Sequence, residues 1–304
     1  MLERAVVEII KIALRSGIRG RTRLTMFLAG KFPELQSYPV RLSEGEQLFL
    51  DLRLVGTHDL LIGKSIEVAE RNVMQAILKP GDVAYDIGAH IGFHTIHLSK
   101  LVGPGGTVIA FEPHPLLLPV LRKTLSELSN VKLFETALSN KSGSIQFYEA
   151  REASMSGFSD WGCGGIAVEV HAETLDHLFQ RQKLPTPDFI KCDIEGAEVF
   201  CFEGAAEMLE VACPIILFEA NMLAASSLGR SASDAIDFLR ELKNPRYCFF
   251  EVEGDGLKEF SADETIFSVH NGYSNILALP AKRYPKVELG KMIRMINDSL
   301  HEGH

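Results

Sequence analysis

Cysteine is scarce in this sequence, and its five cysteines include no C-x-x-C pair of the kind found in zinc sites and redox motifs. An odd number of scattered cysteines also argues against a disulfide framework. No apolar run approaches the roughly 20 residues that are needed to span a bilayer. The first ten residues include Glu3, Arg4 and Glu8, whereas a secretory signal has a long apolar core. We therefore expect a cytoplasmic protein with reduced thiols.

Positive charge is also scarce, because the 304 residues carry a net charge of −9. This balance argues against a nucleic-acid partner. The exception is the segment 1–32, where seven Lys and Arg residues stand against two Glu residues. Residues 1–17 show helical periodicity, with a polar stripe beside a wide apolar face. Two interpretations stay open: peripheral membrane contact through residues 1–24, or packing of this helix on the rest of the chain or across a homodimer, which we favour.

After residue 66 the sequence alternates buried apolar runs with helix-periodic segments. This alternation predicts an α/β fold with a doubly wound, seven-stranded, mostly parallel sheet. We expect an N-terminal amphipathic helix and β-rich lead-in at 1–66, the main domain at 67–282, and a C-terminal helix and tail at 283–304. An extra hairpin is expected at 143–148 and 167–171. The expected strands of the sheet are 83–87, 107–111, 131–136, 188–192, 214–218, 247–252 and 275–279.

A glycine-containing turn follows the first of these strands. The strand ends at Asp86 and Ile87, Gly88 and Gly92 follow, and a helix-periodic segment comes next. Glycine lets the chain turn sharply and lets backbone N–H groups approach a ligand closely. The N-terminus of the following helix favours an anionic group of a ligand. A strand, a glycine turn and a helix in this order predict a ligand crevice.

Glu112 stands at the end of the second strand, where an acid can accept hydrogen bonds from ribose hydroxyls. Together with the glycine turn it predicts a nucleoside site. The glycine spacing is G-x-x-x-G, not the G-x-G-x-x-G of dinucleotide sites. A carboxylate at Asp86 would repel a pyrophosphate but attract the ammonium group of a sulfonium amino acid. The charge therefore favours S-adenosylmethionine over NAD.

Four segments resemble the motifs of the FkbM-type S-adenosylmethionine-dependent methyltransferases, a class I family. They are Asp-Ile-Gly-Ala-His-Ile-Gly at 86–92, Ala-Phe-Glu-Pro at 110–113, Ala-Leu-Ser at 137–139 and Ile-Lys-Cys-Asp-Ile-Glu-Gly-Ala-Glu at 190–198. The block beginning at Asp193 is the most family-specific, and the resemblance runs from about residue 67 to residue 280. It implies a Rossmann-like fold, S-adenosyl-L-methionine as the cofactor, and O-methylation of a sugar, glycolipid, polyketide or other secondary metabolite.

The motifs and the resemblance together identify a set of predicted cofactor-binding residues. Glu67 also matches a glutamate that the family usually places near the site. The predicted set is Asp86, Gly88, Ala89, Gly92, Thr95, Glu112, Pro113, Ala137 and Asp193.

The catalytic candidates are Asp193, Glu195 and His94. A hydroxyl acceptor must lose its proton as it attacks the methyl group, which requires a general base within hydrogen-bond reach. Asp193 and Glu195 follow the fourth strand and reach the same sheet edge as Asp86 and Glu112. Because they are two residues apart, we expect them to point in different directions, with one holding the substrate and the other capping the next helix. His94 is a candidate because its ordinary pKa is near neutrality, although it could equally be a helix residue packed on the sheet.

We expect no metal. Asp193, Glu219 and Asn221 carry hard oxygen ligands of the kind that magnesium prefers, and they are weak candidates. The acid–amide spacing at 219–221 differs from the adjacent pair of the catechol-type methyltransferases, so the resemblance does not extend to their metal site.

Two other functions stay open. A non-catalytic S-adenosylmethionine-binding protein would keep the glycine turn, and an NAD-dependent oxidoreductase would need a third glycine. The acids at 193 and 195 favour an enzyme. We expect a small-molecule acceptor or a glycan- or lipid-linked one. The segment 150–166, which contains Trp161, is a candidate acceptor-binding lid, or else a surface loop without a role.

Overall fold

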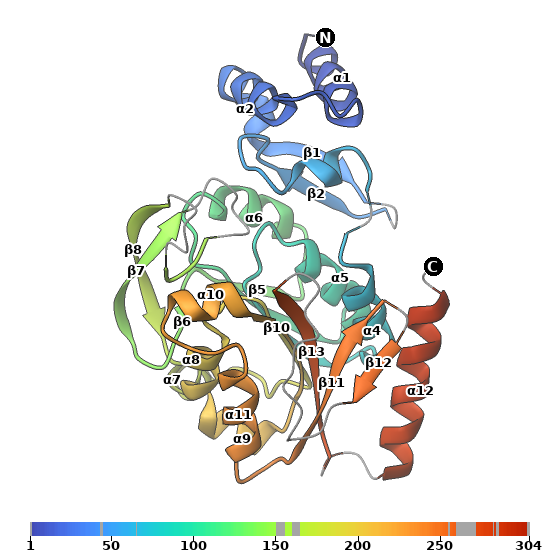
Figure 1. Ribbon diagram of the computed structural model, residues 1–304, viewed down its shortest axis with the longest axis vertical. Helices are drawn as coiled ribbons and strands as arrows, with labels where there is room; N and C mark the ends of the chain where they lie inside the picture. Colours follow the sequence, from blue (N-terminus) through green and yellow to red (C-terminus); the bar gives the residue numbers. More distant parts are fainter. Residues whose placement is uncertain are drawn as a thin grey trace.

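The computed structural model describes residues 2–42, 45–64, 66–149, 156–159, 165–254, 256–259, 272–281, 283 and 286–302. Its centre is an eight-stranded sheet, and helices lie on both of its faces (Figure 1). The strand order is β12 (Gly256–Glu259), β11 (Tyr247–Glu253), β13 (Tyr273–Pro280), β10 (Ile215–Asn221), β9 (Phe189–Cys192), β3 (Val83–Ile87), β4 (Thr107–Phe111) and β5 (Val131–Phe134).

The five strands from β10 to β5 in this order are parallel, and β13, β11 and β12 are antiparallel to their neighbours. All seven predicted strands are present, so the mostly parallel doubly wound sheet is confirmed. The eighth strand, β12, pairs with β11 at the edge of the sheet. Because parallel strands need crossover helices, both faces are covered and their strands are apolar on both sides.

Side chains that alternate along the strands contribute to two hydrophobic cores, one on each face of the sheet. On one face Tyr85 and Ile87 pack with residues of α7, α8, α9 and α11, and on the other Ala84 packs with residues of α4, α5 and α12. Two short helices, α8 and α9, follow Gly196 and are separated at Gly204. The bounds are α4 (Val68–Ile77), α5 (Phe93–Val102), α6 (Leu118–Leu125), α7 (Leu175–Gln182), α8 (Glu198–Glu203), α9 (Ala206–Ala212), α10 (Met222–Ser227), α11 (Asp234–Glu241) and α12 (Lys286–Glu302).

The N-terminal segment forms its own layer at one end of the molecule (Figure 1). Its apolar residues share one core with Ile91 and Phe93 beside the glycine turn and with Leu117 and Val120 near α6. It therefore packs against the elements that shape the crevice. Its elements are α1 (Leu2–Arg15), α2 (Arg21–Lys31), a 3-10 turn (Pro33–Ser37), β1 (Tyr38–Arg41), β2 (Gln47–Leu50) and α3 (His58–Leu61).

A second, three-stranded sheet contains the predicted hairpin. β7 (Gly143–Glu149) pairs antiparallel with β8 (Ile166–Glu173), and β6 (Ala137–Leu138) pairs with β8. Most of the predicted lid between β7 and β8, Trp161 included, lies outside the described residues, as does Cys163. The other four cysteines form no disulfide within the described part of the chain. In the part of the chain that the structure describes, no helix is both long enough and apolar enough to cross a membrane.

Candidate functional site

A cavity of about 290 Å³ opens at the carboxyl ends of β3, β4 and β9. This is the edge at which ligands bind in doubly wound folds. The turns after these strands form its inner wall, and residues 56–67 of the N-terminal segment contribute Gly56, Thr57, Leu60 and Glu67 to its lining. The cavity thus lies between the sheet and the N-terminal layer.

The glycine turn is held tightly against the neighbouring strands. Gly88 has φ +85°, and a β-carbon there would lie 1.9 Å from the carbonyl oxygen of Asp193. The N–H groups of Gly88 and Ala89 both donate to the carbonyl oxygen of Phe111 at 3.0 Å. Only glycine fits position 88, because any side chain would collide with the end of β9.

Glu112 closes one end of the cavity and is 5% exposed. Its two carboxylate oxygens accept hydrogen bonds from the backbone N–H groups of His90, at 2.7 Å, and His114, at 2.8 Å. Burial raises the pKa of Glu112 to about 7, although these two N–H groups oppose the shift. Each oxygen keeps a further lone pair, so the carboxylate can still accept a hydrogen bond from a ligand hydroxyl.

Six of the predicted cofactor contacts line the cavity: Gly88, Ala89, Glu112, Pro113, Ala137 and Asp193. Three others, Asp86, Gly92 and Thr95, are not among its lining residues, and their assignment as cofactor contacts stays a prediction. Asp86 lies inside β3 and accepts a 2.6 Å hydrogen bond from the hydroxyl of Thr95 on α5. Gly92 begins α5 in the left-handed region, where a β-carbon would lie 2.9 Å from the Thr124 side chain. These residues hold the turn in place from behind.

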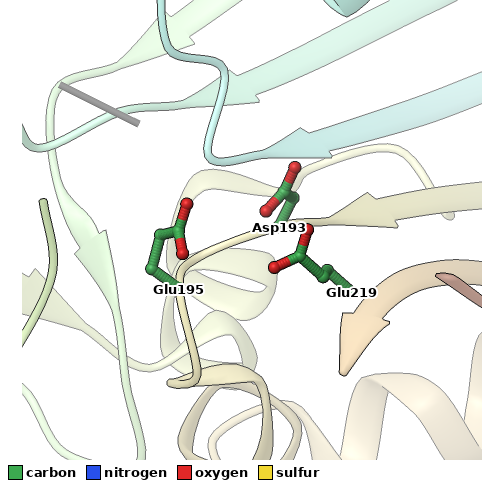
Figure 2. Close-up of side chains that lie close together, drawn as sticks. All are labelled: Asp193, Glu195 and Glu219. Carbon is green, nitrogen blue, oxygen red and sulfur yellow. The ribbon is translucent and has the colours of Figure 1, made fainter. Parts of the chain in front are cut away.

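The carboxylates of Asp193, Glu195 and Glu219 converge, and one oxygen from each lies within 4.8 Å of the others (Figure 2). The expectation that Asp193 and Glu195 point in different directions is therefore wrong. Glu195 has φ +55°, so the chain leaves the extended conformation and the alternation of a strand no longer applies. Neither residue caps the next helix: the N-cap of α8 is Ala197, and the Glu198 carboxylate accepts from the N–H groups of Ile194 and Gly196 in the turn before the helix.

The convergence of the three acids makes their charges costly. Burial, and then repulsion by Asp193, raise the pKa of Glu195 to about 10 and that of Glu219 to about 8. The ammonium group of the buried Lys191 offsets part of the charge by donating to Asp193 at 3.0 Å. At neutral pH the group therefore holds protons, and a cationic ligand beside it would favour the ionised acids.

Among the described residues these three acids are the one group with the spacing to hold a metal ion. Two of them, Asp193 and Glu219, were weak metal candidates. The side chain of Asn221, the third metal candidate, is used in other hydrogen bonds. Its amide oxygen accepts from the N–H of Ala224 at the start of α10, and its amide nitrogen donates to Glu219.

His94 lies on the first turn of α5 and contacts Glu67, the residue at which α4 begins. Both line the main cavity, and both also line a smaller one of about 140 Å³ together with Lys191 and Asp193. All three catalytic candidates thus lie around one space. Sequence analysis missed Lys191, although a lysine inside an otherwise apolar strand was a signal for it.

A model of the FkbM methyltransferase domain matches residues 86–245. The chain is 27% identical to the 2-O-methyltransferase NoeI of Sinorhizobium fredii over 155 residues. This alignment covers 46% of this chain and 63% of that protein. The chain is 26% identical to the hexuronic acid methyltransferase AglP of Haloferax volcanii over 145 residues. That alignment covers 46% of this chain and 58% of the other protein. The matches thus span less than two thirds of either relative.

Solved structures also match. The FkbM methyltransferase of Methylobacillus flagellatus has a TM-score of 0.44 and 15% identity, over 73% of this chain and 52% of that one.

Proposed function

Because the chain belongs to the FkbM family of S-adenosylmethionine-dependent methyltransferases, we propose that it binds S-adenosylmethionine in the larger cavity and methylates a hydroxyl of a sugar-containing acceptor. The observation that carries the proposal is the pairing of the tight glycine turn at Gly88 with Glu112 at the next strand end. Family membership argues against the NAD alternative. A binding protein without activity stays as an outcome of the test.

The residues that line the cavity fit this cofactor. Backbone at Gly88 and Ala89 approaches the ligand, and Glu112 is placed to accept hydrogen bonds from ribose hydroxyls. Asp86 keeps one buried oxygen without a hydrogen-bond partner among the described residues, which adds negative charge behind the turn. Glu67, Asp193 and Glu195 also line the cavity. A cationic sulfonium amino acid would relieve the repulsion among these acids.

When bound, the cofactor supplies a methyl group that is already activated for displacement. The chain's own residues then have two tasks, to position the acceptor hydroxyl and to take its proton. The candidates are His94, Asp193 and Glu195. Asp193 is ion-paired with Lys191, and Glu195 lies beside Asp193 and Glu219 in the group that a cationic cofactor would keep ionised. We therefore assign Asp193 and Glu195 to ligand contact and favour His94, which lines both cavities, as the base.

The acceptor class is proposed from the relatives, whose names specify a 2-O-methyltransferase and a hexuronic acid methyltransferase. A polyol suits the described cavities, because Glu70, Asp193 and Glu219 offer oxygens to sugar hydroxyls.

We further propose that the protein works in the cytoplasm at a membrane surface, on a lipid-linked acceptor. Five large apolar side chains of the first 27 residues are exposed, and this segment holds the chain's local excess of positive charge: Ile9, Ile12, Ile18, Leu24 and Phe27. Exposed apolar groups beside Arg and Lys suit an anionic bilayer surface. A homodimer through the same surface is the competing explanation.

The first test is calorimetry of the full chain with S-adenosylhomocysteine and with NAD. We expect saturable binding of S-adenosylhomocysteine alone, weakened about tenfold or more in Glu112→Gln. The exposed Glu127→Gln is the matched control. Transfer of a labelled methyl group to methyl glycosides of glucose, mannose, galactose and glucuronic acid then tests the reaction. Binding of NAD would overturn the proposal, and cofactor binding without transfer to any acceptor would favour the binding-protein alternative.

A further inference from the structure

The contact between Glu67 and His94 joins the start of α4 to α5, two helices that pack on the same face of the sheet. The Glu67 carboxylate reaches Nε2 of His94 on α5. The His94 side chain is 7% exposed and that of Glu67 is 44% exposed. A carboxylate accepts hydrogen bonds, so a neutral His94 in this contact carries its hydrogen on Nε2. Its other nitrogen, Nδ1, is then an acceptor, and it is buried without a hydrogen-bond partner in the described part of the chain.

The backbone at Glu67 is unusual in a way that its place in the helix does not require. Glu67 is the residue before α4 and has φ +50°, a left-handed conformation that residues other than glycine rarely adopt. An N-cap side chain ordinarily bonds to the N–H groups of its own helix. The Glu67 side chain makes no such bond and extends to α5 instead. Such strain is concentrated at functional sites.

The pair also occupies the junction of the two cavities. Glu67, His94, Lys191 and Asp193 are the residues that line both. The larger cavity contains the glycine turn and Glu112, whereas the smaller one is lined by residues of α4, β10 and β13 that have no part in the nucleoside site. If the cofactor occupies the first cavity, an acceptor in the second meets it beside His94.

We infer that Glu67 is a positioning residue: its carboxylate holds the His94 imidazole so that Nδ1 takes the proton of the acceptor hydroxyl during methyl transfer. This inference rests on the proposed function. The acceptor oxygen forms the new bond to the methyl carbon as the carbon–sulfur bond breaks with its electron pair going to sulfur. The hydroxyl proton moves to Nδ1, and the imidazolium that results is stabilised by the Glu67 carboxylate.

The charges around the pair support this role. Burial alone would raise the pKa of Glu67, but the charge and hydrogen bond of His94, and then the charge of Lys191, lower it to about 2. Because the largest lowering contribution is the charge of a protonated His94, this pKa describes the pair after the proton has moved to the imidazole. The other ionisable groups that interact with this pair are Glu70 on α4, His97 on α5, His90 after β3 and Lys191 on β9.

Glu70 provides a matched control, because it lines the same smaller cavity but bonds to Asn275 instead of His94. The test compares the wild type, Glu67→Gln, Glu70→Gln and His94→Gln as full-length chains. The primary measurement is NMR of ¹³C,¹⁵N-histidine-labelled protein, in which the signal missing from His94→Gln identifies His94. Calorimetry with S-adenosylhomocysteine shows whether each variant keeps a folded cofactor site.

We expect His94 in the wild type to carry its hydrogen on Nε2 near neutral pH. In Glu67→Gln its titration should move to lower pH, because the imidazolium loses its anionic partner, whereas Glu70→Gln should move it less, because the Glu70 carboxyl bonds to Asn275 and not to His94. All variants should bind S-adenosylhomocysteine within about threefold of the wild type. With the glycoside that is methylated fastest, Glu67→Gln should lower kcat about tenfold and move the acid limb of its pH profile, and His94→Gln should lower kcat about a hundredfold.

Two results would overturn the inference. One is a hydrogen on Nδ1 in the wild type. The other is a His94 titration that Glu67→Gln leaves unchanged, or changes no more than Glu70→Gln. If Glu67→Gln instead loses S-adenosylhomocysteine while the His94 signals stay the same, Glu67 is a cofactor contact. Failure of the wild type to bind S-adenosylhomocysteine would count against the proposed function and leaves the tautomer measurement to decide on the pair alone.

Discussion

The α-carbon of Gly88 lies so close to the carbonyl oxygen of Asp193 that a β-carbon at position 88 would sit 1.9 Å from that oxygen. The contact joins the turn after β3 to the end of β9, and both line the larger cavity. The width of the cavity at this point is therefore set by one glycine.

Gly88→Ala tests this relationship. We expect it to lower the free energy of unfolding by about 3 kcal/mol or more, because it combines a positive φ with a collision against backbone. It should also abolish S-adenosylhomocysteine binding. Gly81→Ala is the control: Gly81 has φ +97° but open space around it, so it should cost only about 1 kcal/mol. Chemical denaturation and calorimetry measure both effects, and equal losses in the two variants would show that the collision does not matter.

The converging acids predict a pH dependence of stability. The folded-state pKa values of Glu219, about 8, and Glu195, about 10, lie above the ordinary value of 4.5. A raised pKa contributes stability that is present below pH 4.5 and is lost as pH rises through the folded value. Between pH 6 and 9 the ligand-free protein should therefore lose on the order of several kcal/mol of stability, at about 1.4 kcal/mol per pH unit for each acid that is protonated only in the folded state.

Glu219→Gln should reduce the loss of stability with rising pH, because the amide has no proton to release. Glu135→Gln should leave the slope unchanged, since Glu135 is an ion-paired residue whose pKa is lowered. The measurement is urea unfolding at several pH values. A slope that is the same in Glu219→Gln and the wild type would show that this acid is not held protonated.

The exposed apolar side chains of the N-terminal layer predict membrane association. Ile12 and Phe27 are 66% and 61% exposed. Replacing both by Ser should weaken partitioning onto vesicles that contain about 30% anionic lipid by about a thousandfold, since the two together lose roughly 4 kcal/mol of apolar transfer. Val211→Ser is the matched control, because Val211 is 74% exposed on α9, outside this layer. If the wild type is a dimer that the double variant dissociates, the surface is an interface between copies instead.

The strands and the acids at their ends could be predicted because each strand is an apolar run that stops at a polar residue. The directions of some side chains could not. In β3, alternation turns Asp86 toward α5, so its contact with Thr95 depends on how that helix packs. The convergence of Asp193 with Glu195 follows from a left-handed turn at a residue that is not glycine, which no local pattern announces.

The Glu67–His94 contact could not be predicted from the sequence either. The two residues are 27 positions apart and meet only because α4 and α5 pack on the same face of the sheet. A lone acid before a helix is ordinarily solvated, so its sequence context gave no reason to pair it with a particular histidine.

The position of β13 in the sheet has a consequence for synthesis. β13 lies between β10 and β11, although it follows both in the chain. During translation β10, β11 and β12 all emerge before β13. Until β13 follows, β11 can pair only with β12, and β10 has an unpaired edge. Both edges stay open until residue 280 has left the ribosome, and open edges invite association with other nascent chains. The charged residues on β11 and β12, such as Glu251 and Lys258, lie where they would discourage such pairing in the meantime.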